Sequence, residues 1–230
     1  MCFSPEASFA AGAILLPAGL VSVRRAYITD RRYLALMALP VLFGLQQFSE
    51  GLVWTAGARG DAKLVEQSSL AYVFFTWLAW PVWVPVSVYF LESVRRRPLY
   101  LMFAIAGGML GALQYVPYFI HEGWLVTRFL RHAISYEGTV LLDYVTKREV
   151  TYAIYIAVVI GPLLLASDWN VKFFGGLVLG VLIITYLFFS YAYISVFCFG
   201  GALMSLYLVW VMFGGGLAQR FISTPGHMGR

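Results

Sequence analysis

Two amides and a carboxylate interrupt an apolar stretch of the chain, LFGLQQFSEGLVW at residues 42–54. In a helix, Gln46, Glu50 and Trp54 lie four residues apart on one face, and Gln47 lies beside that face. Such a carboxylate can act as a general acid or base, or it can bind the polar part of a ligand. Because an ionisable residue within a membrane usually faces the bundle interior or a water-filled cavity, this face is the first candidate site.

A depth estimate places more polar side chains at the level of Glu50. At the helical rise, Glu50 lies about 25 Å along its segment from Tyr33, in the outer third of a hydrocarbon layer about 30 Å thick. The other outer-half residues are Cys2, Ser4, Glu6, Thr76, Trp77, Trp80, Gln114, Tyr115, Tyr152, Tyr155, Tyr186, Ser190, Tyr191, Ser195 and Cys198. We therefore predict a pocket in the outer half of the bundle, with the ligand-binding residues Gln46, Gln47, Glu50, Trp54, Gln114, Tyr115, Tyr186, Ser190 and Cys198.

These residues also admit two interpretations without a ligand. Tyr and Trp concentrate at membrane interfaces whatever the function, which accounts for Trp54, Trp124 and Tyr152. An aromatic belt does not account for the glutamines or the carboxylate, but buried amides can also join helices in a purely structural network.

The composition is that of a membrane protein. Of the 230 residues, 61% are hydrophobic and 12% are charged, whereas soluble domains carry about 25% charge. Repeated apolar runs of about 20 residues indicate an all-α polytopic bundle, and one transmembrane domain accounts for residues 1–230. The net charge of +5 comes largely from basic clusters beside apolar runs, as in VSVRRAYITDRR, so we expect no nucleic-acid partner.

Seven hydrophobic segments are expected to cross the membrane, and a count of six or eight fits less well. They run over 7–23, 33–54, 70–91, 99–119, 150–166, 173–191 and 194–214. Basic residues in the loops 24–32 and 95–97, at Lys172 and in the C-terminal tail share one side of a seven-span bundle. The positive-inside rule makes that side cytoplasmic, with the N-terminus outside and the C-terminus in the cytoplasm, in a bacterial inner membrane.

The connection from His121 to Glu149 is the longest one. Its apolar residues follow one another at four-residue spacing and its basic residues fall largely on another face: Leu125, Phe129 and Ala133 against Arg128, Arg131 and His132. This pattern predicts an amphipathic helix in the outer interface between spans four and five. Such a helix would cap the bundle; alternatively, its basic face would bind lipid headgroups.

Several cofactor chemistries lack the residues that they need. The last apolar segment contains no lysine for a retinal Schiff base, and His121, His132 and His227 lie outside the segments that would bind haem or chlorophyll. The seven-span topology is similar to that of ceramidase-type zinc hydrolases, but the histidines show no HxxxH or equivalent spacing. Copper bound by Cys2, Cys198 and a methionine would need a richer set of soft ligands. We expect no metal site and no cofactor.

The two cysteines admit three arrangements. Removal of Met1 would expose Cys2 as an N-terminal nucleophile with Glu50 as its base, and Ser4 is a second candidate nucleophile. A disulfide between Cys2 and Cys198 would instead tie the N-terminal arm to the seventh span. Two free cysteines are the third arrangement.

Three segments, MCFSPEASFAAGAILLPAG, LFGLQQFSEGLVW and YISVFCFGGALMS, together resemble an uncharacterised family of bacterial polytopic membrane proteins, a domain-of-unknown-function group. Members of that family begin with Met-Cys-Phe/Trp-Ser, carry an amide or His–Gln pair ahead of a Glu and a Trp in the second span, and have a Cys-Phe pair in the last. The matching positions are Cys2, Ser4, Gln47, Glu50, Trp54 and Cys198. Gln46 stands where many members have histidine, which argues against a metal or general-base role there. The resemblance covers most of the chain and implies a seven-span bundle without an established activity.

We expect the protein to bind a lipid-like or small amphipathic ligand, or a partner membrane subunit, through the outer pocket. Its partners would be membrane lipids and either a larger membrane complex or further copies of itself. Two alternatives stay open: a membrane enzyme acting on a lipid-soluble substrate, with Glu50 as acid or base and Cys2 or Ser4 as nucleophile, and a small-solute transporter. Transport needs a polar path on both sides, and the inner half of the spans is apolar.

Overall fold

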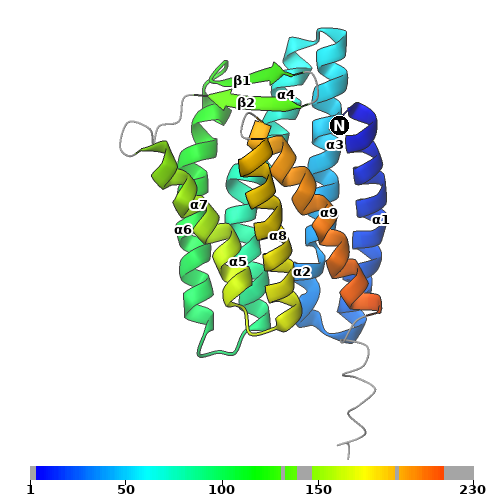
Figure 1. Ribbon diagram of the computed structural model, residues 1–230, viewed down its shortest axis with the longest axis vertical. Helices are drawn as coiled ribbons and strands as arrows, with labels where there is room; N and C mark the ends of the chain where they lie inside the picture. The colour runs from blue at the N-terminus through cyan, green and yellow to red at the C-terminus, as the bar shows by residue number, and fades with distance from the viewer. Residues whose placement is uncertain (1–3, 131–132, 139–146, 190–191, 215–230) are drawn as a thin grey trace, which may run out of the picture.

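A computed structural model describes residues 4–130, 133–138, 147–189 and 192–214, and these form a bundle of roughly parallel and antiparallel helices with a small hairpin at one end (Figure 1). Seven helices in it are long and apolar enough to cross a membrane, which confirms the predicted count. The elements are α1 (Pro5–Thr29), η1 (Arg31–Tyr33), α2 (Leu34–Met37), α3 (Leu39–Arg59), α4 (Ala62–Phe74), η2 (Phe75–Ala79), α5 (Trp80–Leu91), α6 (Arg97–Ile120), β1 (Leu125–Phe129), β2 (Ile134–Gly138), α7 (Arg148–Leu165), α8 (Trp169–Phe188) and α9 (Tyr193–Phe213).

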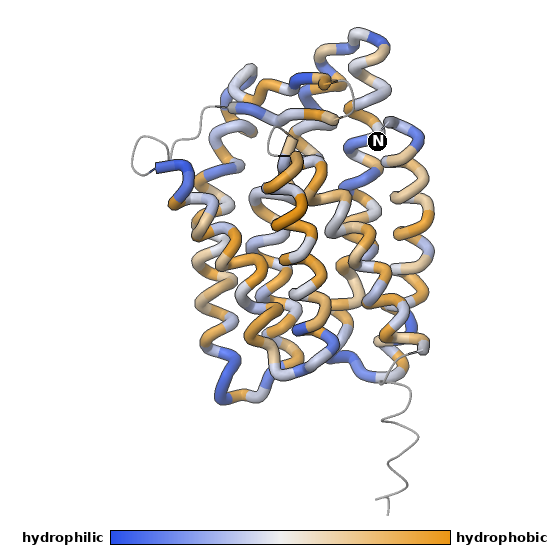
Figure 2. The backbone as a smooth tube through the Cα atoms, in the orientation of Figure 1, coloured by the Kyte–Doolittle hydropathy of each residue, from blue (hydrophilic) through white to orange (hydrophobic). Residues whose placement is uncertain are grey.

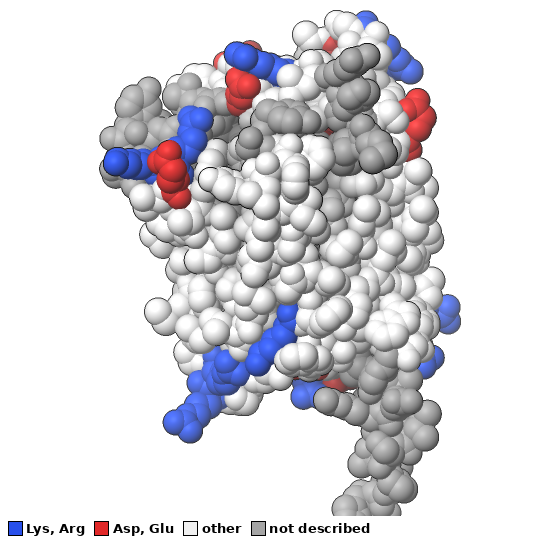
Figure 3. All heavy atoms as spheres, viewed as in Figure 1, with Lys and Arg blue, Asp and Glu red and all other residues white. Residues whose placement is uncertain are grey.

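The two ends of the bundle are polar and the zone between them is apolar (Figure 2). On the face that Figure 3 shows, the charged side chains gather toward the two ends and leave the middle uncharged. The loops 30–33, 92–97 and 166–168 lie together at one end, which we call the basic end. The strands β1 and β2 lie at the opposite end, which we call the hairpin end (Figure 1).

Local sequence signals set the ends of the helices. The Ser4 hydroxyl accepts a hydrogen bond from the Ala7 amide at the start of α1, and the Asp61 carboxylate accepts one from the Leu64 amide at the start of α4. Gly60 ends α3 in the left-handed conformation at φ 69°, which glycine adopts without strain. These caps produce the tight turn between α3 and α4, so that the two helices run side by side.

The third span is not one regular helix, because it passes from α4 through the π-helical turn η2 into α5. Pro81 and Pro85 have no N–H to donate, so the carbonyls of Trp77 and Pro81 cannot receive the usual helical hydrogen bond. Gly111 and Gly107 of α6 lie directly against these two carbonyls, where an added Cβ would overlap the backbone oxygen. Two glycines therefore bring α6 into close contact with the irregular part of the third span.

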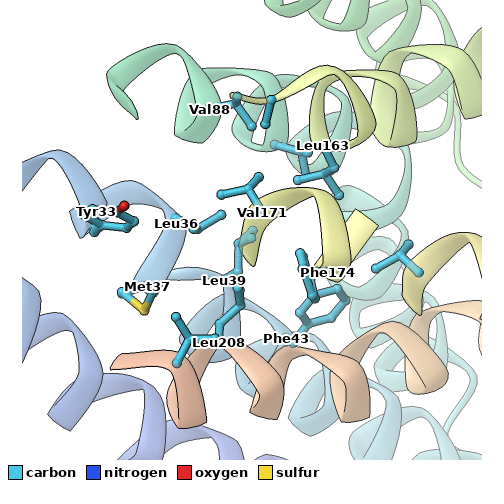
Figure 4. Close-up of a cluster of buried hydrophobic side chains, with 14 of the residues drawn as sticks. Tyr33, Leu36, Met37, Leu39, Phe43, Val88, Leu163, Val171, Phe174 and Leu208 are labelled. Atoms are coloured by element: carbon cyan, nitrogen blue, oxygen red, sulfur yellow. The ribbon is translucent and has the colours of Figure 1, made fainter. Parts of the chain in front are cut away.

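A cluster of buried apolar side chains fills the bundle toward the basic end. Leu39 and Phe43 of α3, Phe174 of α8 and Leu208 of α9 approach one another in it (Figure 4). A second cluster lies toward the hairpin end and is richer in aromatic rings: Val53, Tyr72, Val73, Tyr118, Leu125, Ile134, Tyr136, Ile194 and Cys198. The polar residues of the spans therefore have apolar packing on both sides.

The connection between spans four and five forms a β-hairpin, so the prediction of an amphipathic helix is wrong. The strands β1 and β2 pair antiparallel, with Leu125 opposite Gly138 and Phe129 opposite Ile134. Burial alternates along β2, where Ile134 and Tyr136 face the bundle. The same residues fit both a four-residue apolar spacing and a two-residue alternation of β-branched and aromatic side chains. Contacts of β1 with α4 and of β2 with α9 favour the strand.

A buried carboxylate holds two loops together at the basic end. Glu92 is 4% exposed and accepts hydrogen bonds from the amide and the hydroxyl of Ser167. Arg96 lies 3.5 Å from the same carboxylate and also donates to the Leu165 carbonyl. This cluster ties the loop between α5 and α6 to the turn between α7 and α8.

We predict that Glu92→Gln destabilises the bundle by about 2 kcal/mol, because it leaves Arg96 and one Ser167 donor without the carboxylate. Breaking a fully buried ion pair costs about 3–5 kcal/mol, and the cost is smaller here because Arg96 is half-exposed. In a thermal unfolding experiment on detergent-extracted protein this corresponds to a midpoint lower by about 5 °C. Glu149→Gln on exposed α7 is the matched control and should change the midpoint little. Equal midpoints for the two variants would show that the Glu92 cluster contributes nothing.

Candidate functional site

Glu50 lies inside the bundle and is fully buried. One of its carboxylate oxygens, Oε1, accepts a hydrogen bond from the Ser195 hydroxyl of α9. Ser8 of α1, Gln47 of α3 and Tyr72 of α4 lie close enough to interact with the same carboxylate. Four helices thus converge on one acidic side chain, and no one of them could build the site alone.

Tyr136 closes this group from the hairpin end. Its ring stacks on that of Tyr72 with a centroid separation of 4.8 Å, and it interacts electrostatically with Glu50. Burial raises the pKa of the Tyr136 phenol well above its ordinary value, so the group stays a neutral hydroxyl. We call Ser8, Gln47, Glu50, Tyr72, Tyr136 and Ser195 the Glu50 site.

Most polar atoms of the Glu50 site have no hydrogen-bond partner among the described residues. They are Glu50 Oε2, both amide atoms of Gln47, Ser8 Oγ, Tyr72 Oη and Tyr136 Oη. A buried polar group without a partner costs roughly 1–3 kcal/mol, and native proteins contain few of them. Four side chains with such atoms therefore surround the Glu50 carboxylate, and the site has hydrogen-bonding capacity that the described residues do not use.

Gln46 behaves differently from Gln47, because both ends of its amide are satisfied. Its Nε2 donates to the Thr76 hydroxyl at 3.0 Å, and its Oε1 accepts from Trp80 Nε1 at 3.1 Å. The Thr76 hydroxyl lies 3.5 Å from Cys198 Sγ, and the Thr76 carbonyl accepts from the Tyr155 hydroxyl at 2.6 Å. This set, which we call the Gln46 network, joins α3, α5, α7 and α9 across the π-helical turn.

The hairpin lies over the Glu50 site and is held by polar and apolar contacts. The Thr127 hydroxyl donates to Ser69 Oγ of α4 at 2.8 Å. The ring of Phe129 fills the space beside Gly57, where an added Cβ would overlap it, and packs 5.9 Å from Trp54. With Leu125, Ile134 and Tyr136 also buried, the hairpin acts as a cover that separates the site from the hairpin end.

An apolar cavity of about 30 Å³ lies below the Gln46 network, toward the basic end. It is bordered by Trp80 and Cys198, and the rest of its wall is apolar: Leu39, Phe43, Val84, Val159, Leu163, Phe174, Val178, Phe197 and Gly201. A cavity of this volume exceeds the space that one water molecule needs, but apolar walls offer water no hydrogen bonds. Cys198 also interacts with Tyr72, so the cavity and the Glu50 site meet at this residue.

The structure brings part of the predicted set together. Gln46, Gln47, Glu50 and Cys198 lie in the two connected clusters just described. Trp54 and Tyr115 pack around the aromatic cluster at the hairpin end, and Gln114 is buried on α6 with its amide oxygen unpaired among the described residues.

Four other predicted residues do not join the site as described. Tyr186 is 75% exposed on α8, so its placement in the pocket is wrong. Ser4 caps α1. Cys2 and Ser190 lie outside the described residues. The predicted disulfide between Cys2 and Cys198 therefore also involves a residue outside them.

Four members of the Glu50 site were absent from the predicted ligand-binding set, and of these only Ser195 had been named among the outer-half residues. Ser8 and Tyr72 looked like ordinary residues of apolar segments, and Tyr136 belonged to the misassigned connection. A signal was present in the third span, because Tyr72, Thr76 and Trp80 repeat the four-residue spacing of Gln46, Glu50 and Trp54. Two rows of polar and aromatic residues with the same spacing, one on each of two consecutive antiparallel helices, can face each other.

Comparison with known proteins places the chain in a family but not in a functional class. A family model described as "Family of unknown function (DUF6629)" matches residues 1–218. No curated protein and no solved structure matches the chain. The match spans all seven helices and the whole Glu50 site, as the resemblance of the three sequence segments led us to expect. The chain therefore belongs to DUF6629, a family of multi-pass membrane proteins of unknown function.

Proposed function

We propose that the protein binds a small amphipathic ligand within the membrane, with the polar end of the ligand at the Glu50 site and its apolar part in the cavity beside Cys198. The observation that carries the proposal is the group of unpaired polar atoms around the fully buried Glu50. In lipid, such atoms find no water to bind, so a bound ligand that donates and accepts hydrogen bonds stabilises them.

The adjoining cavity supports an amphipathic ligand over a purely polar one. Its wall is apolar, and it meets the polar cluster at Cys198. Its volume of about 30 Å³ fits only a short apolar group, so a longer chain needs space from a neighbouring helix. Phe174 and Val178 of α8 form part of the wall, and α8 packs mainly against α7 and α9. An outward shift of α8 would widen the cavity toward the lipid.

We further propose that the hairpin end faces outward from a bacterial inner membrane. Arginines and lysines of the loops at the basic end support this orientation, since such residues mark the cytoplasmic side. The Glu50 site then lies in the outer half of the bilayer, covered by the hairpin.

Three other functions have less support: an enzyme, a transporter and the binding of a partner subunit. An enzyme would use Glu50 as acid or base, but the predicted nucleophile Ser4 caps α1, and the hydrogen bond to this carboxylate comes from the Ser195 hydroxyl instead. A transporter would need a second path through the apolar cluster that fills the basic half. A partner subunit would bind to apolar side chains that are exposed on the helix surfaces.

The experiment is native mass spectrometry of the full chain after gentle extraction, comparing the wild type with Glu50→Gln. We expect the wild type to retain a small molecule and the variant to bind it 10- to 100-fold more weakly, because a hydrogen bond to a charged group contributes about 1.5–3 kcal/mol. Glu149→Gln, on the exposed start of α7, should retain the ligand like the wild type. Equal retention by wild type and Glu50→Gln would refute the proposal.

A further inference from the structure

We infer that the group bound at the Glu50 site is a monovalent cation, either an inorganic ion such as Na⁺ or the ammonium end of an amphipathic amine. This inference concerns the site of the proposed function: the amine rests on that function, whereas an inorganic ion would use the same oxygens without an amphipathic ligand. It follows from the charge of the site and from the kind of atoms that face the ligand.

The charge comes first. The ion pairs between described residues join Arg32 to Asp30, Arg96 to Glu92 and Arg128 to Glu137, and none of them includes Glu50. The groups that interact with the Glu50 carboxylate are the neutral side chains of the site. A buried carboxylate without a positive partner is strongly disfavoured, so Glu50 either takes up a proton or binds one positive charge, and binding of a cation releases that proton. A divalent ion would leave a net positive charge in the same apolar surroundings.

The unpaired atoms are the second observation. Apart from the Gln47 amide nitrogen, all of them are oxygens: the free carboxylate oxygen of Glu50, the amide oxygen of Gln47, and the hydroxyls of Ser8, Tyr72 and Tyr136. Each has a lone pair to offer, and such oxygens suit hard cations and ammonium donors. A phosphate or carboxylate headgroup would meet the Glu50 charge without any described arginine or lysine to offset it.

Na⁺ and an ammonium group would bind the same oxygens, but only an amine also carries an apolar part. Na⁺ would use only the oxygens of the Glu50 site. An amine would in addition place its apolar part toward Cys198 and the cavity. The two sources are therefore distinguished by whether an apolar chain strengthens binding.

The test measures thermal unfolding of the purified full chain in detergent. The reference buffer contains N-methylglucamine chloride, which is replaced at constant ionic strength by NaCl, or supplemented with decylamine or with its anionic counterpart decanoate. We expect one of these probes to raise the midpoint saturably, by about 5–10 °C at a hundredfold excess over its Kd. A shift with NaCl assigns an inorganic ion, and a shift with decylamine alone assigns an ammonium ligand.

Variants connect the shift to the site. Glu50→Gln should abolish it, and Tyr72→Phe, which removes a single hydroxyl, should weaken binding about tenfold by the loss of one ligand oxygen. Tyr72→Phe keeps the ring that stacks on Tyr136, so it remains informative if Glu50→Gln does not fold. Glu149→Gln should respond like the wild type.

Three results would overturn the inference: no shift with either cation, an unchanged shift in both site variants, or a larger shift with decanoate than with decylamine. Its failure is separable from that of the proposed function. A neutral or anionic molecule retained by the wild type and lost in Glu50→Gln would refute the cation and support the ligand site. A saturable midpoint shift with NaCl, without any retained organic molecule, would support the cation and refute the amphipathic ligand.

Discussion

Replacing Phe129 with alanine is expected to raise the rate of thiol modification at Cys198 about 30-fold. The Phe129 ring anchors the hairpin by filling the space at Gly57 and packing on Trp54. A buried Phe→Ala change costs about 3–5 kcal/mol, and because Phe129 is 42% exposed we expect about 2 kcal/mol. A cover that opens more easily by this amount exposes the buried thiol about 30 times as often.

The measurement uses a Cys2→Ser background, in which Cys198 is the only cysteine, and a soluble maleimide. Phe90→Ala is the matched control, because Phe90 is 47% exposed but lies near the end of α5 at the basic end. Its modification rate should equal that of the background. If Phe129→Ala reacts no faster than Phe90→Ala, the hairpin is not what protects the site.

Gly107→Leu is expected to lower the thermal midpoint of the bundle by about 10 °C or more. The new side chain would overlap the Pro81 carbonyl, which is backbone and cannot rotate away. Pro85 has no N–H to donate to that carbonyl, so the carbonyl lacks its usual helical hydrogen bond and lies against the backbone of α6 instead. Overpacking of this kind costs about 1–3 kcal/mol or more, and separation of the helices adds the loss of their contacts.

The neighbouring residue provides the control for this prediction. A Cβ at Gly108 would lie 3.6 Å from the nearest atom, Val82 Cγ2, which is an ordinary contact. Gly108→Leu on the same turn of α6 should therefore change the midpoint by no more than about 2 °C. Similar losses in both variants would mean that leucine at this depth of α6 is harmful for some reason other than the contact with α5.

The spans were predictable because their signal is strong and local. A run of about 20 apolar residues has few alternatives in a chain of this composition, and the seven predicted segments correspond to the seven helices. The hairpin was not predictable with the same rules, because LVTRF and ISYEG satisfy both a helical and an alternating pattern. Contacts such as Thr127 with Ser69 decide between the two, and they join residues 58 positions apart.

The site was predictable only where one helix face carries several polar residues. Gln46, Gln47 and Glu50 form such a face, and the structure buries all three. The sequence of α8, WNVKFFGGLVLGVLIITYLF, does not indicate which face is buried, because apolar side chains point in nearly every direction. Tyr186 faces outward in the structure. Ser8 and Tyr136 join the site through contacts between distant segments, which a single sequence does not contain.

The hydrogen bond between Ser195 and Glu50 spans 145 positions of the chain. Ser8 belongs to α1 and Ser195 to α9, the first and the last of the described helices, so the site exists only after α9 has joined the bundle. Until α9 is inserted, the Glu50 carboxylate lacks its Ser195 donor while the rest of α3 is already in the membrane. Closure of the site therefore waits for α9, and a chain truncated before α9 keeps a Glu50 carboxylate without its Ser195 donor, which distinguishes it from the chain that contains α9.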